Sequence, residues 1–210
     1  MYFDRYLKFP YFIFVLKRFF SHDIQKIREN AIKNKNKKFC AAVISNNFNS
    51  QIFRFNFIQE LNKYKKVEMG GRSFKNIGKT VKDKINFLSS YKFSFAMENS
   101  EGDGYITEKI LDSFLAGTIP IYYGDYMVDE YINPKAFILI KGKKDMQNKI
   151  EYIKRIDSND ELYHSLLKEK VFNENYKKIM EKYTNEKIKF LVNIFIQESI
   201  KSKRLDNYYS

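Results

Sequence analysis

The sequence predicts an α/β fold in which helices cover both faces of a mostly parallel, Rossmann-like sheet. Short apolar runs alternate with amphipathic stretches of helical length between Phe39 and Ile140, and such an alternation forms parallel βαβ units. The chain of 210 residues is 44% hydrophobic and 17% aromatic, with only 8 Gly and 3 Pro. It can therefore bury a core, and this composition excludes a disordered or collagen-like chain.

The expected elements follow one another along the chain. Strands are predicted at residues 39–45, 66–69, 92–97, 118–122 and 136–140. Helices are predicted at residues 51–64, 81–90 and 105–116, and after residue 141 at 146–156, 160–169 and 176–200. One local conflict is Pro120, which removes a ladder donor inside a predicted strand.

Composition limits the classes of site and partner. The single cysteine, Cys40, excludes an intrachain disulfide and a multi-cysteine zinc site. No apolar segment approaches the roughly 20 residues of a membrane span, so a soluble or peripheral protein is expected. The net charge of +13 would attract phosphates, nucleic acid or anionic lipid. Part of that charge reflects a composition rich in Lys, Asn, Ile, Phe and Tyr, which have A- and T-rich codons.

The loop at residues 98–104 is the best candidate for a binding site. Ligands of open α/β sheets bind beyond the carboxyl ends of the strands, and this loop joins a predicted strand to a predicted helix. Gly102 and Gly104 allow positive φ and close approach of the backbone, and the helix start offers unpaired N–H groups to an anion. A diphosphate suits such a turn, although an ordinary tight turn has the same glycines.

Charged residues near this loop fit the same interpretation. Lys109 can reach a phosphate, whereas the Glu108 carboxylate should accept hydrogen bonds from neutral hydroxyls such as those of a ribose. The alternative is a solvated first helical turn in which the helix dipole favours Glu108. Arg54, early in the predicted 51–64 helix, could reach the same anion. Tyr123 either lines the crevice or packs in the core.

The segment KFSFAMENSEGDGYITEKILDSFLAGTIPIYYGD, residues 92–125, closely resembles the signature of the α-1,3/4-fucosyltransferases, glycosyltransferase family 10. The resemblance continues through residues 133–138 and covers the chain to about residue 170. It implies a GT-B fold, in which two Rossmann-like domains face one another across the active site. This chain then corresponds to the C-terminal, GDP-fucose-binding half, and the N-terminal acceptor domain is expected to be missing.

The resemblance also implies roles for single residues. Arg54 and Lys109 would contact the diphosphate of GDP-fucose, Asn99 and Tyr105 would help to bind it, and Glu108 would take the ribose hydroxyls. No Asp-x-Asp motif is present, so neither an obligatory metal ion nor a cofactor is expected.

Two further residues, Glu98 and Tyr123, are expected at the pocket wall. Tyr123 stands where the family often carries Trp, which would alter that wall. The implied reaction transfers fucose, with inversion, to a hydroxyl of a GlcNAc or Glc unit of an oligosaccharide. The catalytic residues are unknown, because the family's base lies in the domain expected to be missing.

Two alternatives to the fucosyltransferase interpretation stay open. One is a catalytically inactive remnant or module that binds a GDP-sugar, and the other is a basic nucleic-acid-binding protein. The basic residues are scattered and no recognised nucleic-acid motif occurs, so no nucleic-acid partner is expected.

The expected organisation has three parts. Residues 1–37 form an inter-domain or linker remnant, residues 38–170 the donor-binding domain, and residues 171–210 a helical tail. The tail ends in the basic cluster 201–204, and it would either pack on protein or lie on an anionic membrane surface. The expected location is the cytoplasm, or the inner face of the membrane as a peripheral protein.

Overall fold

A computed structural model describes residues 15–45, 52–72, 74–100, 102, 104–178 and 181. The chain divides into two compact units, Met1–Asn173 and Glu174–Ser210. The predicted 176–200 helix lies almost wholly outside the described residues. None of the helices that the structure describes is long and apolar enough to cross a bilayer.

A parallel sheet of five strands forms the centre of the first unit. The strands are β1 (Lys38–Ala42), β2 (Val67–Met69), β3 (Tyr91–Met97), β4 (Ile119–Tyr123) and β5 (Ile138–Leu139). Their order is β2-β1-β3-β4-β5. In this register Cys40 lies opposite both Val67 and Phe93. Because β2 lies on one side of β1 and all later strands lie on the other, the topological switch point falls between β1 and β3.

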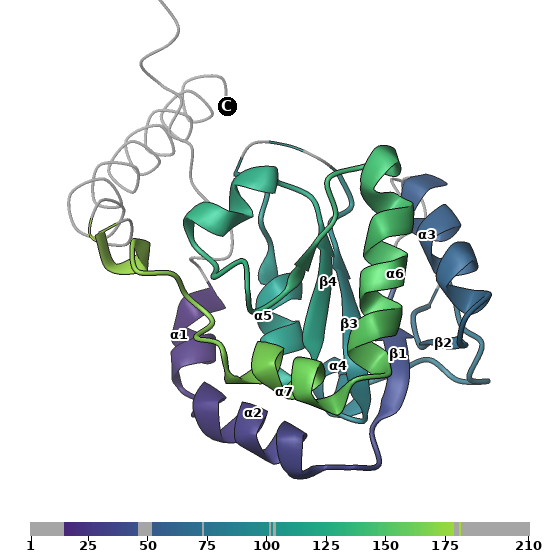
Figure 1. Cartoon of the computed structure of the whole chain (residues 1–210), viewed down its shortest axis with the longest axis horizontal. Coiled ribbons are helices and arrows are strands. Elements are labelled where there is room, and N and C mark those ends of the chain that lie inside the picture. The colour runs from purple at the N-terminus through teal and green to yellow at the C-terminus, as the bar shows by residue number, and fades with distance from the viewer. Residues whose placement is uncertain are drawn as a thin grey trace, which may run out of the picture. The chain divides into compact units, whose positions relative to one another are not determined.

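Helices cover both faces of this sheet, with α6 in front of it and α5 behind it in Figure 1. The α-helices are α1 (Leu16–Phe20), α2 (Ile24–Lys33), α3 (Ile52–Asn62), α4 (Lys84–Leu88), α5 (Glu108–Leu115), α6 (Met146–Asp157) and α7 (Asp160–Lys168). Two 3₁₀ turns, η3 (Tyr126–Glu130) and η4 (Lys143–Asp145), lie in the loops. The helix predicted at 105–116 begins only at Glu108, because Thr107 is its N-cap.

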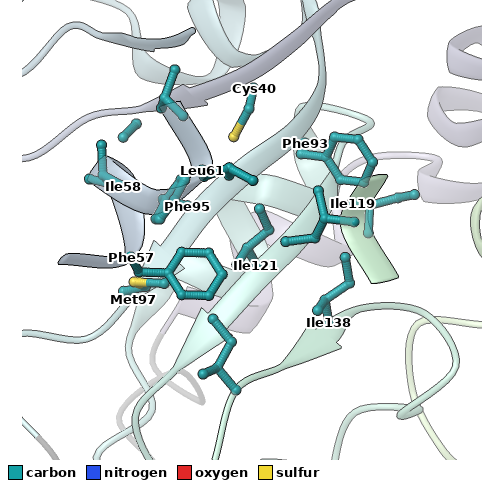
Figure 2. Packing of buried hydrophobic residues seen from close by; sticks show 14 of the residues in the cluster. Cys40, Phe57, Ile58, Leu61, Phe93, Phe95, Met97, Ile119, Ile121 and Ile138 are labelled. Carbon is teal, nitrogen blue, oxygen red and sulfur yellow. The ribbon is translucent and has the colours of Figure 1, made fainter. Parts of the chain in front are cut away.

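The larger core lies on the sheet face covered by α3, α6 and α7. Figure 2 shows side chains of α3 packed against those of the strands, among them Phe57, Leu61, Phe95 and Ile121. Each apolar side chain of this size that is fully buried stabilises the fold by about 1.5–3 kcal/mol. On the opposite face a smaller cluster joins Ala41, Leu88, Tyr91 and Ala116.

Pro120 fits within β4 although β4 is not an edge strand. The Tyr122 carbonyl accepts a hydrogen bond from the N–H of Ile140 at 2.9 Å, so Tyr122 faces β5. Alternate residues of a strand face the same neighbour, and Pro120 therefore also faces β5. The β5 register begins only at the Ile121–Ile138 pair. Pro120, which has no N–H, thus precedes the part of β4 that pairs with β5, and the sheet loses no backbone hydrogen bond.

The residues before β1 pack against the sheet domain. Arg28 of α2 is buried and donates to the carbonyl oxygens of Leu166 and Leu167 in α7, at 2.6 and 2.8 Å. The helices α1 and α2 thus belong to the same compact unit as the sheet. The three-part division at residues 37 and 170 stays a prediction.

Candidate functional site

A cavity of about 250 Å³ lies at the carboxyl ends of β1 and β3, at the topological switch point. Its wall comes from the residues after β1, the first turns of α3, α4 and α5, and the end of β3. The lining residues are Val43, Ile44, Ser45, Arg54, Lys84, Phe95, Met97, Asn99, Glu108 and Lys109. Loops diverge at a switch point, which leaves room for a ligand.

Arg54 lines this cavity and has unused hydrogen-bond donors. Its side chain is only 2% exposed, and Nη1 donates to Oδ1 of Asn99 at 3.0 Å. The buried Nε and Nη2 have no partner among the described residues. Burial lowers the pKa of Arg54, and the negative charge of Glu98 opposes that shift. A guanidinium stays protonated in proteins, so a buried cation with free donors is costly until an anion satisfies it.

A buried ion pair positions Lys109 at the same cavity. Glu98, fully buried after β3, accepts from the backbone N–H of Thr107 at 2.8 Å and from Nζ of Lys109 at 2.7 Å. Gly124 makes room for this carboxylate, since a Cβ there would lie 2.6 Å from Cγ of Glu98. Glu98 therefore holds Lys109 from behind, and both of its oxygens are already bonded.

The loop before α5 is tied to the end of β4 by Asp125. This buried carboxylate accepts from the N–H groups of Gly104 and Met127. Of the two glycines that allow a positive φ, Gly104 adopts one, at +78°. Gly102 does not, and an added Cβ there would only touch Cβ of Tyr105 at 3.7 Å.

Four of the residues proposed from the sequence meet around the cavity: Arg54, Asn99, Glu108 and Lys109. Glu108 is half-buried at the start of α5, and its carboxylate has no hydrogen-bond partner in the part of the chain that the structure describes. A free carboxylate beside two cations can accept hydrogen bonds from hydroxyl groups of a ligand that the cations attract.

Three other proposed residues do not line the cavity. Tyr105 is 38% exposed in the loop before α5, and Glu98 lies behind Lys109. Tyr123 packs in the core against Phe53, with ring centroids 4.4 Å apart. The side chains of Glu98 and Tyr123 are therefore not exposed at the pocket wall.

Sequence reasoning missed Lys84, the first residue of α4. Its Nζ donates to Oδ2 of Asp112 at 3.0 Å, and its side chain lines the cavity. The polar stretch before it carries several lysines without a motif, so no local signal distinguishes this one. Within the described ranges, no group of three or more His, Cys, Asp or Glu is placed to hold a metal ion.

A Rossmann-like sheet with a cavity at its switch point places the chain among the open α/β proteins, whose ligands bind at the carboxyl ends of the strands. Residues 32–196 match the C-terminal region of glycosyltransferase family 10, the fucosyltransferases, and the chain belongs to this family. The resemblance noted in residues 92–125 is thus confirmed.

Several relatives support this assignment. The α-(1,3)-fucosyltransferase FucT of Helicobacter pylori is 38% identical over 137 residues, which cover 65% of this chain and 28% of that protein. The putative fucosyltransferase R654 of Acanthamoeba polyphaga mimivirus is 32% identical over 176 residues, 77% of this chain and 28% of that protein. The chain therefore spans less than a third of the length of either relative.

Solved structures share the fold. A crystal structure of an α1,3-fucosyltransferase with GDP-fucose superposes with a TM-score of 0.63 at 35% identity, covering 77% of this chain and 51% of that one. A second, with GDP, gives the same score and identity and covers 50% of that chain. The predicted Rossmann-like half of a GT-B glycosyltransferase is confirmed.

Proposed function

We propose that this chain forms the donor-binding half of an α-1,3-fucosyltransferase, which transfers fucose from GDP-fucose to a hydroxyl of a GlcNAc or Glc unit. The observation that carries the proposal is the buried Arg54 guanidinium, which has two nitrogens without a partner among the described residues and belongs to the lining of a cavity that Lys109 and Glu108 also line. The GDP-fucose and GDP named for the solved relatives support the choice of ligand.

The cavity can recognise the diphosphate and the ribose of a nucleoside diphosphate. Arg54 and Lys109 bind the diphosphate oxygens, and Asn99 orients Arg54 through its 3.0 Å hydrogen bond. The ribose hydroxyls donate to the Glu108 carboxylate. Tyr105, exposed in the loop between Asn99 and α5, is the fifth residue that we assign to this donor site.

The cations also suit the chemistry of transfer. In a single inverting displacement, the bond from fucose C1 to the β-phosphate oxygen breaks as C1 bonds to the acceptor oxygen. Negative charge then grows on the departing GDP, where Arg54 and Lys109 stabilise it without rearranging. Burial of Arg54 strengthens this interaction, since water screens it less. We propose that these cations balance the diphosphate with no obligatory divalent ion.

The acceptor proton must pass to a base, which we place in the acceptor half of the GT-B enzyme. Glu98, which lies behind the cavity lining, is already bonded to Lys109 and Thr107, and Glu108 is assigned to the ribose. This observation favours a second candidate, a module that binds GDP-fucose and does not transfer it. The family assignment argues against the nucleic-acid-binding alternative.

Calorimetric titration with GDP and GDP-fucose, at moderate salt and without metal, tests donor binding. We expect binding that Lys109→Ala weakens at least tenfold, because a charged hydrogen bond contributes about 1.5–3 kcal/mol. The control is Lys63→Ala, which removes an exposed lysine paired with Glu60 after α3. A folded chain that binds neither nucleotide would refute the proposal.

A transfer assay then separates the two candidates. The purified chain is incubated with GDP-fucose and N-acetyllactosamine, alone and mixed with an acceptor domain from a family member. Transfer only in the mixture supports the fucosyltransferase, and tight donor binding without transfer in either case supports the binding module.

A further inference from the structure

Asp112 links two cations behind the cavity. This α5 residue is 5% exposed, and its Oδ1 accepts from Nη2 of Arg18 in α1 at 2.8 Å. Its Oδ2 accepts from Nζ of Lys84 at 3.0 Å. Lys84 lines the cavity with a side chain that is 28% exposed, whereas Arg18 lies outside the lining.

The balance of charge at the cavity depends on Lys84. Among the described residues that line the cavity, or are linked to its lining by an ion pair or by two successive ion pairs, four are basic and three are acidic. They are Arg18, Arg54, Lys84 and Lys109 against Glu98, Glu108 and Asp112. Glu98 is ion-paired with Lys109, and Asp112 is ion-paired with both Arg18 and Lys84. The set carries one net positive charge, and removal of the Lys84 charge would make it neutral.

We propose that Lys84 is a third cation for the diphosphate, and that Arg18 is a positioning residue that keeps Lys84 available. This inference rests on the proposed function. An ammonium has three N–H donors, and Asp112 uses one of them, so two can point to a ligand. Because Arg18 shares the Asp112 carboxylate, that carboxylate attracts Lys84 less strongly. Through Asp112, α1 thus influences the affinity of a site that it does not line.

The first test measures the Kd for GDP by calorimetry in Lys84→Met and Lys84→Arg. Lys84→Met should bind GDP roughly tenfold more weakly at low salt, since a charged hydrogen bond is lost. The ratio of the Kd of Lys84→Met to the Kd of the unmodified chain should shrink in about 1 M salt, because salt screens the partly exposed charge of Lys84. Lys84→Arg should keep most of the affinity. Lys63→Met, which removes an exposed lysine distant from the lining, should change nothing.

The second test is a double-mutant cycle between Arg18 and Lys84. Arg18→Met should weaken GDP binding about threefold, because Asp112 then holds Lys84 alone, and it should have no further effect in the Lys84→Met background. A purely structural role for Arg18 would lower the melting temperature but would weaken binding equally in both backgrounds. That result overturns the positioning role.

The outcomes also separate this inference from the proposed function. If the unmodified folded chain does not bind GDP, both fail. If it binds GDP and loses that binding in Arg54→Met, but Lys84→Met binds as tightly as the unmodified chain, only the role of Lys84 is refuted.

Discussion

Replacing Arg54 by methionine should stabilise the free protein and abolish nucleotide binding. In the folded chain Arg54 is buried, and two of its nitrogens lack partners among the described residues. In the function that we propose, these donors are kept for an anion at the expense of stability. Methionine fills a similar volume without a charge, so it removes the penalty together with the binding determinant.

The magnitude follows from the hydrogen bonds of Arg54. Two unsatisfied buried donors cost about 1–3 kcal/mol each, and more when they are charged. The bond to Asn99 that is lost contributes about 1.5–3 kcal/mol, and Asn99 is exposed enough for water to replace it. The free energy of unfolding should rise by about 1–3 kcal/mol, in the range found when apolar residues replace buried charges.

Urea denaturation followed by far-UV circular dichroism measures this change, with tyrosine fluorescence as a second probe because the chain has 16 Tyr and no Trp. Arg28→Met is the matched control. Arg28 is equally buried, but it donates to two α7 carbonyls, so its loss should destabilise the protein by about 3 kcal/mol. The reasoning is refuted if Arg54→Met destabilises the fold as Arg28→Met does, or if it still binds GDP.

Three further predictions concern other buried positions. Gly124→Ala should destabilise the fold by about 1–3 kcal/mol in urea titrations and weaken GDP binding, since its Cβ would displace Glu98; Gly102→Ala, with space around it, should be nearly neutral. Burial lowers the pKa of Lys37 to about 8 from its ordinary 10.5. Between pH 8 and 10.5 the unfolded chain therefore binds more protons than the folded chain. The free energy of unfolding should rise with pH across that window, relative to that of Lys37→Met. Parallel plots of unfolding free energy against pH for the two proteins would contradict this prediction. Burial also raises the pKa of the Cys40 thiol. Maleimide reacts with an accessible thiolate, so it should label Cys40 only as fast as the protein unfolds. Rapid labelling of the native protein would refute this prediction.

The order of elements could be predicted from the sequence because hydrophobic periodicity reports which residues are buried. The ends of elements were less predictable. The fifth strand is shorter than predicted, at Ile138–Leu139, and α5 begins three residues late, at Glu108. Each boundary depends on a particular hydrogen bond, such as the Thr107 cap or the pairing of β5 with β4, and residue pattern does not specify these bonds.

The sequence by itself determined the alternation of strands and helices, the membership of a fucosyltransferase family, and four of the residues around the cavity. Those features are local, since periodicity and motifs extend over neighbouring residues. Only the tertiary structure showed the unused donors of Arg54 and the link from Arg18 through Asp112 to Lys84, whose members lie 94 and 28 positions from Asp112. Charges so far apart in the chain meet because α4 packs against α5 and Arg18 of α1 reaches Asp112 of α5, and their pairing depends on that tertiary arrangement and not on any local pattern.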